Sequence, residues 1–486
     1  MNPQHQYNFF TDLPYQTVVV MLKQLLKQDD GIEIFDRLFN IHNDHIINCL
    51  LLAQNKKSLC LMDTRLWILC LYSMGYDGRR NHFNPANTMY DWDDSNIAYQ
   101  KNVIDNCLYT SRVHDLIDLR EESQMARFLL QRLYNQTRDP YERAFLLGRQ
   151  PVQDQIQFRN YTLSNYLHRW IRGEIRGGPP IKYWDVRGVT NMSRLFEVIN
   201  GVKNINELDL TYWDVSKVTD MSFMFRNYTN IIFRGLTNWN TCRVTNMHHM
   251  INNIFNSDIS NWDVSKVTNM SNMFHAAISF NQYIGDWDTS RVTDMSEMFS
   301  RAIVFNQNIG KWDTSRVENM SLMFKDTRVF NQDIGRWDTS NVRNMSGMFD
   351  EARVFNQDIG RWDTSNVRDM SWMFSDARAF NQDIGGRDGS WITSRVQNMS
   401  RMFDRATVFN QNIGRWDTSR VTDMSGMFEA AIAFNQPLIW DTRNVENMSW
   451  MFYRAISFDQ LLYWNVNNAT DRTSMFDDSQ GRFIII

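Results

Sequence analysis

The sequence predicts an α/β solenoid of about twelve stacked coils, each of about 25 residues with one strand and one short helix, over 181–476. The first observation is a regular tryptophan, which occurs five times in succession at intervals of 25 residues, at Trp262, Trp287, Trp312, Trp337 and Trp362. The second is that the residues between the tryptophans also repeat, as in FNQDIGRWDTSNVRNMSGMF from Phe330. Self-similarity at a fixed period of about 20–50 residues is typical of stacked repeat proteins.

The methionine-rich part of each repeat predicts the short helix. Met345, Met348, Phe349 and Ala352 have the i, i+3, i+4, i+7 spacing that places side chains on one helical stripe. An Asp-Thr-Ser run precedes this segment and has the residue types that cap helix N-termini. Because a helix of about two turns is unstable alone in water, we expect it to pack on neighbouring coils.

The segment FNQDIGRW, residues 355–362, predicts the strand. It is too short for a helix and carries an apolar residue near each end, and a turn is expected after it at Trp-Asp-Thr-Ser. One such segment per coil predicts a parallel stack of strands with the helices on the other side. At a strand spacing of about 4.8 Å, twelve coils would form a rod or arc on the order of 60 Å long.

Three departures from the repeat are informative. The ninth unit reads IGGRDGSWITS where its neighbours read IGRWDTS, which predicts a bulged surface loop at Gly385–Ser390. The first four units are irregular, with Leu195 and Phe196 in place of Met-Phe, and the last has Asn465 in place of aspartate. Atypical terminal units are what capping coils require.

The run WDTSNVRNMSGMF resembles the repeat of BspA-like leucine-rich-repeat proteins, also called mycoplasma lipoprotein-type repeats, which read W-D-[VT]-S-x-V-T-[DN]-M-S-x-M-F with F-N-Q-x-I upstream. The resemblance recurs in most units and implies a leucine-rich-repeat-like horseshoe or rod. The family includes bacterial surface proteins and proteins of protists and large DNA viruses. It has no shared catalytic residues to carry over to this chain.

The regions that flank the repeats predict end caps. Leu163–Trp170 resembles the short helix that precedes the first W-D-V unit in such proteins, and the RGGPP run at 176–180 would be a hinge, so 161–180 is interpreted as an N-terminal cap. The tail, 477–486, ends in FIII and is expected to pack on the last coil.

Residues 1–160 lack the repeat and predict a mostly helical domain. An amphipathic helix is expected over Leu13–Leu26, with Pro14 in its first turn. Together with DTRLW at 63–67, this Leu-Pro start resembles a degenerate F-box, which proteins of large DNA viruses often join to repeats. The resemblance implies that Leu13–Leu26 would dock a ubiquitin-ligase adaptor.

Composition restricts the class of protein. The formal net charge is −4, so no global basic field favours nucleic acid or an anionic membrane. The first ten residues, MNPQHQYNFF, lack the basic and apolar regions of a secretory signal, and no apolar run reaches membrane-spanning length. We therefore expect an intracellular protein, in the host cytoplasm or in a virus particle if the source is viral.

Several repeated polar residues were weighed as functional groups. The aspartate of each Trp-Asp pair could be catalytic, but a turn or helix cap that accepts backbone amides explains it better. The asparagine of each F-N-Q, as at Asn331 and Asn356, predicts a buried stack that satisfies backbone groups, with ligand or glycan contact as the alternative. The His248-His249 pair lacks a nearby third ligand, so we expect no metal and no cofactor.

Two charged columns are the best candidates for partner binding. Lysine or arginine precedes the repeat tryptophan in four units, and aspartate lies three residues before that position in three units: Lys311, Arg336, Arg361 and Arg415, with Asp333, Asp358 and Asp383. Like charges stacked at strand spacing repel each other, so each column needs a partner. One reading is Asp-to-Arg pairing within and between coils, a second is a face that meets a partner protein, and a third is a nucleic-acid groove.

Two functions follow, and neither is enzymatic. The first is an interaction scaffold whose solenoid binds one protein while its helical N-terminal domain docks another. The alternative is a structural component of a virus particle or a cell surface. A hydrolase is a weaker third hypothesis, because the sequence contains no phosphate-binding loop, nucleophile elbow or zinc signature.

Overall fold

The computed structural model describes Val18, Leu22 and most of the chain from residue 158 onward. The described ranges are 158–175, 180–197, 205–226, 231–251, 253–386, 391–466 and 470–485. Val18 and Leu22 are buried helical residues. The rest of the predicted N-terminal domain, including the F-box-like motif, lies outside the described residues.

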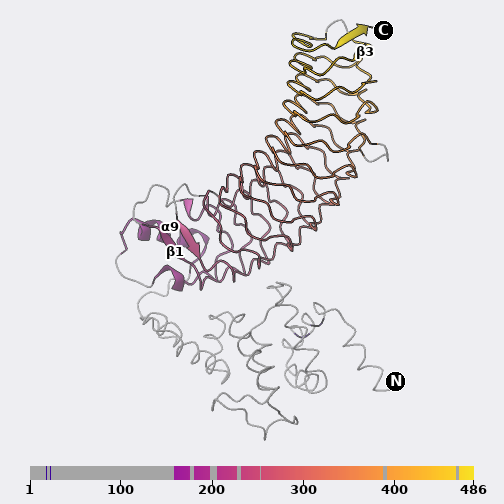
Figure 1. Cartoon of the computed structure of the whole chain (residues 1–486). Coiled ribbons are helices and arrows are strands. Elements are labelled where there is room, and N and C mark those ends of the chain that lie inside the picture. Colours follow the sequence, from indigo (N-terminus) through magenta and orange to yellow (C-terminus); the bar gives the residue numbers. More distant parts are fainter. Residues whose placement is uncertain are drawn as a thin grey trace, which may run out of the picture.

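Regular secondary structure is confined to the two ends of the described repeat region. The helix α9 spans Asn160–Ile171 and overlaps the short helix expected there, and a 3-10 turn, η3, follows at Ile181–Tyr183. The strands are β1 (Glu207–Asp209), β2 (Ile232–Arg234), β3 (Leu461–Trp464) and β4 (Arg482–Ile485). Between them the chain winds as a gently curved stack of similar coils, from α9 and β1 to β3 (Figure 1).

One residue per coil holds the stack in register. Eleven isolated parallel bridges connect the residue before each Met-Ser, or its equivalent, to its counterpart in the next coil, in an unbroken series from Asn191 to Asp471. Each bridge joins residues one repeat apart, as between Asn344 and Asp369. Side chains at the same repeat position therefore lie above one another along the whole stack.

The short helix predicted over Met345–Ala352 is wrong: this segment is a run of turns. The amides of Met345 and Gly347 donate to carbonyls of the next coil, Asp369 O at 3.0 Å and Ser371 O at 2.7 Å. The amide of Met348, the residue after Gly347, donates to Met345 O at 3.2 Å and closes a turn. A helix would satisfy these amides internally, whereas here alternate amides hold the next coil. The turns need positive φ, with 58° at Gly347.

The spacing that predicted the helix still identified the core. Met345, Met348, Phe349 and Ala352 are fully buried. A run of turns with alternate residues fixed by the next coil presents the same side chains inward as a helical stripe would. The periodicity was therefore correct about burial and wrong about the backbone.

The strand predicted at 355–362 is also absent from the regular secondary structure. The backbone there is irregular, and only the terminal units pair as parallel strands, β1 with β2 and β3 with β4. The tail residues of β4 pair in register with β3, from Leu461 with Arg482 to Trp464 with Ile485. The expectation that the tail packs on the last coil is therefore confirmed.

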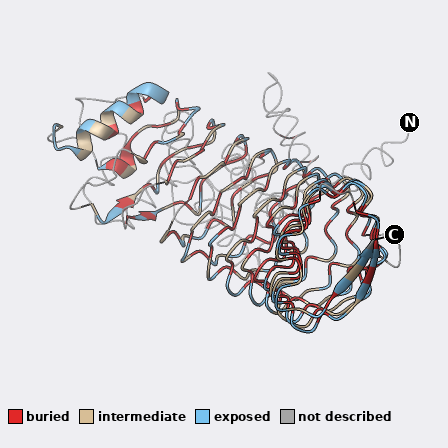
Figure 2. Ribbon diagram, turned by 90° about the horizontal axis from the view of Figure 1, so that it is seen from above, coloured by how far each residue is buried: buried red, intermediate tan, exposed pale blue. Residues whose placement is uncertain are grey.

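Three aromatic columns fill the interior of the stack, where buried residues recur from coil to coil (Figure 2). Trp312, Trp337 and Trp362 stack with centroid distances of 6.4 and 6.3 Å. Phe349 stacks on Phe355 of the same coil at 4.0 Å, and each phenylalanine also stacks on its counterparts in adjacent coils. Each buried indole must find an acceptor, and Trp337 Nε1 donates to Ile309 O of the preceding coil at 3.2 Å.

The insertion in the ninth unit directly precedes a repeat tryptophan, Trp391, in the sequence. Residues 387–390 are outside the described residues, but the chain on either side can be followed to Gly386 and from Trp391. Trp391 keeps the interior hydrogen bond, to Ile359 O at 2.8 Å, and stacks on Trp416 at 6.1 Å. The extra residues are therefore accommodated without loss of the repeat register.

The N-terminal end of the stack is covered by α9. Leu163 and Leu167 of this helix are fully buried, and Tyr166 and Trp170 make edge contacts with Trp184 of the first coil at 5.1 and 5.6 Å. The helix thus covers the first tryptophan of the column.

We predict that Trp337→Ala lowers the free energy of unfolding by roughly 3–5 kcal/mol, because the change opens a cavity in a buried column. Chemical denaturation of the two proteins measures it. The control is Trp372→Ala, because Trp372 is 40 % exposed and lies outside the column. Equal losses for the two variants would show that the tryptophan column does not carry the stability.

Candidate partner-binding surface

Each regular coil turns at three side-chain-capped corners. In one coil the carboxylate or amide oxygens of Asp333, Asp338 and Asn344 accept the backbone N–H two residues further on, at 2.9, 3.0 and 2.9 Å. Short polar side chains that accept a nearby amide stabilise such turns. The interpretation of the Trp-Asp aspartate as a turn residue is therefore confirmed at Asp338.

The F-N-Q segments form a ladder of side-chain amides. Asn356 N donates to Asn331 Oδ1 of the preceding coil at 2.9 Å, and Gln357 Nε2 donates to Asn331 O at 3.0 Å. The same asparagine contact is made in each coil from Asn281 to Asn435. The asparagines thus satisfy backbone amides as predicted, but they are partly or fully exposed rather than buried.

The predicted charged columns lie on the surface. All seven predicted partner-binding residues are exposed: Lys311, Arg336, Arg361 and Arg415, which we call the basic column, and Asp333, Asp358 and Asp383, which we call the acidic column. The acidic residues accept the amide of the glycine two residues on, as at Asp333, Asp358 and Asp383, each at 2.9 Å.

The Asp-to-Arg pairing considered from the sequence is not observed between the two columns within the described residues. No ion pair joins them among the described residues, where Lys311 contacts Asp286 at 3.9 Å. Arg336, Arg361 and Arg415 form no ion pair or hydrogen bond within the described ranges. The guanidinium groups are therefore exposed charges with no counter-charge supplied by the stack.

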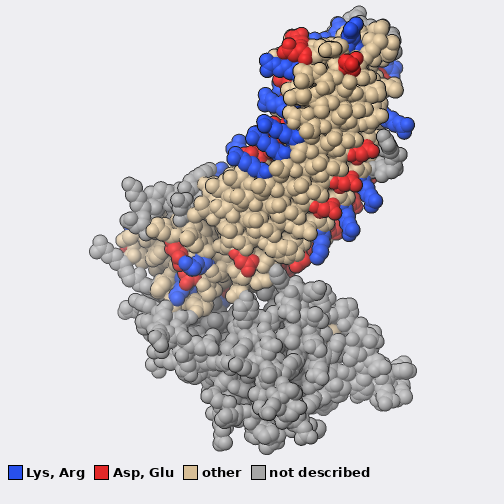
Figure 3. Space-filling view, viewed as in Figure 1, with Lys and Arg blue, Asp and Glu red and all other residues tan. Residues whose placement is uncertain are grey.

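One broad face of the stack carries few charged side chains. Figure 3 shows this face of the stack with charged side chains gathered along both edges. In sequence, the V-F-N-Q runs lie between arginines such as Arg353 on one side and aspartates such as Asp358 on the other. Val329 and Val354 on these runs are 43 % and 41 % exposed. The structure thus offers a flat polar and aliphatic strip bordered by charge.

A row of buried and half-buried polar residues, most of them ionisable, was missed in the sequence. The residue after each Met-Phe varies from coil to coil, and in five successive coils it is Lys325, Asp350, Ser375, Asp404 and Glu429. Lys325 Nζ contacts Asp350 Oδ2 at 2.6 Å. The sequence did show that this position varies from repeat to repeat, which could have marked it as functional. It did not show that the side chain at this position points inward.

Asp404 has the most perturbed environment in this row. Its side chain is 2 % exposed, and its pKa is raised to about 6 by burial and by the carboxylate of Glu429 in the next coil. Arg405 and Arg401 oppose the shift, and Arg401 lies 3.5 Å from Asp404 and 3.0 Å from Glu429. Register places these two acids on adjacent coils, so each destabilises the charge of the other.

Three histidines gather near the irregular fourth unit. His249 and His275 have ring centroids 5.6 Å apart, although they are 26 residues apart in sequence. Burial lowers both pKa values, that of His249 to about 4, so both rings are neutral near pH 7. No group of three metal-ligating side chains with suitable geometry occurs in the part of the chain that the structure describes.

These features define a repeat protein in which in-register coils present surface columns of side chains. Four overlapping stretches, residues 174–253, 227–328, 305–390 and 386–482, match the family described as "Mycoplasma protein of unknown function, DUF285". Together they span 174–482, well over half of the chain, which therefore belongs to this family. No curated protein and no solved structure matches the chain.

None of the described helices is both long enough and apolar enough to cross a membrane.

We predict that the folded protein becomes more stable as the pH falls from 7.5 to 4.5, because Asp404 becomes protonated. A carboxyl group whose pKa is raised by folding destabilises the folded state when ionised, and this penalty disappears as pH falls through about 6. Asp404→Asn should therefore raise the free energy of unfolding at pH 7.5 by about 1–3 kcal/mol, with a smaller effect at pH 4.5.

The matched control is Asp358→Asn. Asn412 occupies the equivalent position two coils on and accepts the equivalent glycine amide, so this exchange should change stability little at either pH. Urea unfolding of the three proteins at both pH values provides the measurement. A gain from Asp404→Asn that is the same at both pH values would contradict the assignment.

Proposed function

We propose that this protein is a non-enzymatic interaction scaffold whose leucine-rich-repeat-like solenoid binds a partner protein. The basic column carries the proposal, because Arg336, Arg361 and Arg415 are exposed and have no counter-charge within the described residues. Exposed arginines contribute to recognition through bidentate contacts with carboxylates. The partner surface should accordingly be acidic.

The arrangement of the column supports a specific rather than a diffuse contact. Lys311, Arg336 and Arg361 occupy the same position in three successive coils, so their backbones are held at the repeat spacing by the parallel bridges. Charges held on a rigid frame lose little conformational freedom when they meet complementary charges. The acidic column beside them disfavours nucleic acid, because it would repel a phosphate backbone.

The helical N-terminal domain would dock a second protein. The F-box resemblance at Leu13–Leu26 motivates a ubiquitin-ligase adaptor as that protein, in a chain of the type found in large DNA viruses. Affinity capture with the full chain tests this, and adaptors should be recovered less well with the double variant Leu13→Ala/Pro14→Ala. Equal recovery with both proteins would exclude this contact.

The alternative is a structural component of a virus particle or a cell surface. A stack held by the same contacts in every coil would serve as a strut. The alternative predicts that the protein is abundant in purified particles or envelopes and has no soluble pool, which fractionation and quantitative mass spectrometry would measure.

For the scaffold, we predict that Arg336→Glu/Arg361→Glu leaves folding nearly unchanged and abolishes capture of acidic partners. Both side chains are exposed and form no ion pair or hydrogen bond with another described residue, so their reversal removes no such contact. Capture by the wild-type chain should also weaken as salt rises from low to physiological ionic strength.

The matched control is Arg420→Glu, the same reversal at an exposed arginine in a different column. Circular dichroism and thermal unfolding establish folding, and quantitative proteomics of the captured proteins gives the outcome. A variant that unfolds while its residual folded fraction still captures the same partners would show that the column is structural.

A further inference from the structure

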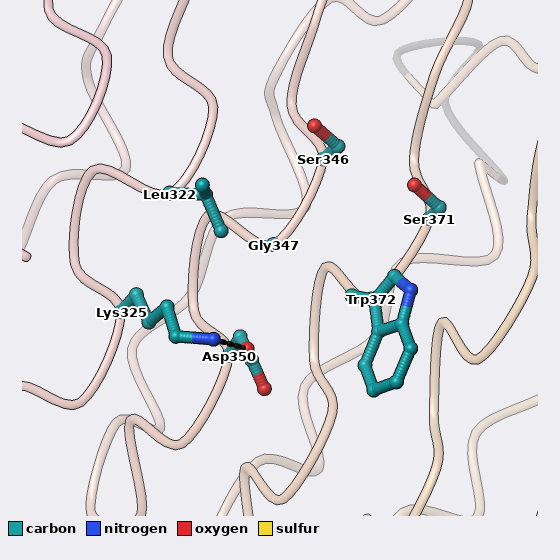
Figure 4. Close-up of a pocket in the computed structure, with 7 residues that line it drawn as sticks. All are labelled: Leu322, Lys325, Ser346, Gly347, Asp350, Ser371 and Trp372. Atoms are coloured by element: carbon teal, nitrogen blue, oxygen red, sulfur yellow. Dashed lines mark hydrogen bonds and ion pairs between the residues drawn. The ribbon is translucent and has the colours of Figure 1, made fainter.

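A cavity of about 300 Å³ opens on the stack, and no residue of the basic column lines it. It lies over Gly347, with Leu322 of the preceding coil and Trp372 of the following coil as its walls (Figure 4). Lys325 and Asp350 border one side, and Ser346 and Ser371 border the other. We call this cavity the Gly347 slot.

The slot exists because one member of a side-chain column is missing. The variable residue x of the M-S-x-M-F motif, directly before the second methionine, has positive φ. In successive coils this residue is Glu297, Leu322, Gly347, Trp372 and Arg401. Side chains at this position stack on their neighbours where they are present. Arg194 lies 4.3 Å from the ring centroid of Phe223, and Phe223 stacks on His249 at 5.4 Å.

Glycine at 347 leaves one face of Trp372 without a stacking partner among the described residues. The Arg401 guanidinium lies 4.9 Å from the Trp372 ring centroid and comes from the next coil, on the other side from Gly347. Trp372 is 40 % exposed. The column thus contains a space for one flat group, between an indole and an aliphatic wall.

Charge decides what kind of flat group fits. Arg401 already lies over Trp372, and the Lys325 ammonium borders the slot, so a second guanidinium would meet two cations. Asp350 is paired with Lys325 at 2.6 Å, which reduces its attraction for another cation. An uncharged aromatic ring avoids this repulsion and stacks on indole.

We propose that the Gly347 slot binds the aromatic side chain of a partner polypeptide, with tyrosine or phenylalanine as the inserted residue. The site rests on the proposed scaffold function and adds a second contact on the partner. A cavity of this size accepts one aromatic side chain, and it lies at the lower limit of about 300 Å³ for small-molecule pockets. Aromatic anchors in pockets commonly dominate protein interfaces.

The other glycine of this column shows that absence of a side chain alone does not create a site. A Cβ at Gly426 would lie 3.1 Å from Arg401 Cγ and 3.3 Å from Glu429 Oε2. Arg401 extends over Gly426 to reach Glu429 at 3.0 Å. That position is therefore covered by the chain's own arginine.

Titration with N-acetyl-tyrosinamide tests the slot without requiring a partner. The full chain is labelled with ¹⁵N-indole tryptophan, and the Trp372 signal is assigned by its loss in Trp372→Phe. We expect a saturable shift of this signal with a millimolar Kd, and no comparable shift with N-acetyl-leucinamide. Absence of a saturable Trp372 shift with the tyrosine probe would overturn the proposal.

Gly347→Leu should abolish the response by filling the slot. Leucine is compatible with the backbone, since Leu322 has φ 56° at the same position one coil earlier. The new Cβ would collide with the terminal methyl Cδ2 of Leu322, which can rotate. Gly426→Leu is the matched control in the same column at φ 59° and should keep the response. A full response in Gly347→Leu would also overturn the site.

Partner capture separates failure of the slot from failure of the scaffold function. If Arg336→Glu/Arg361→Glu abolishes capture and Gly347→Leu does not weaken it, the slot proposal fails and the scaffold function stands. If no protein is captured through the basic column, the scaffold function fails whatever the outcome of the tyrosine titration. Loss of capture in Gly347→Leu, with Gly426→Leu unaffected, supports both.

Discussion

Every coil of this protein depends on the next for its backbone hydrogen bonds. In the M-S-x-M-F segment, alternate amides donate to carbonyls one repeat further along the chain, while the amides between them close local turns. A buried amide without a hydrogen-bond acceptor costs free energy. A regular coil on its own would leave these alternate amides without their acceptors. The parallel bridges, at one residue per coil, belong to the same set of contacts between successive coils. Stability in such a stack is a sum over neighbouring pairs.

Register turns each repeat position into a column, and the columns divide into two kinds. Uniform columns of tryptophan, phenylalanine and methionine are buried and fill the interior, where identical rings stack and indoles such as those of Trp337 and Trp362 donate to carbonyls of the preceding coil. Variable columns lie at the surface or just beneath it. The chain can vary these positions without disturbing the backbone, so the candidate binding features are found in them.

The same constraint explains the electrostatics. A residue placed after one Met-Phe faces its counterpart on the next coil, so Asp350 meets Lys325 and forms an ion pair. Two coils further on, Asp404 and Glu429 meet instead, and the pKa of Asp404 is raised. The same stacking geometry therefore gives an attractive or a repulsive charge contact. The residue type at this position in each coil decides which of the two forms.

The sequence by itself determined the period, the buried residues, the position of the insertion and the surface columns at Arg336 and Asp333. It did so because burial and repetition leave a direct periodic pattern in the residues. It did not determine the backbone: the spacing from Met345 to Ala352 fits a helix and a run of turns equally, and only contacts with the next coil decide which forms. The Gly347 slot and the Asp404–Glu429 contact were likewise decided by the tertiary structure. Each depends on residues about 25 positions apart that become neighbours only when the coils stack in register.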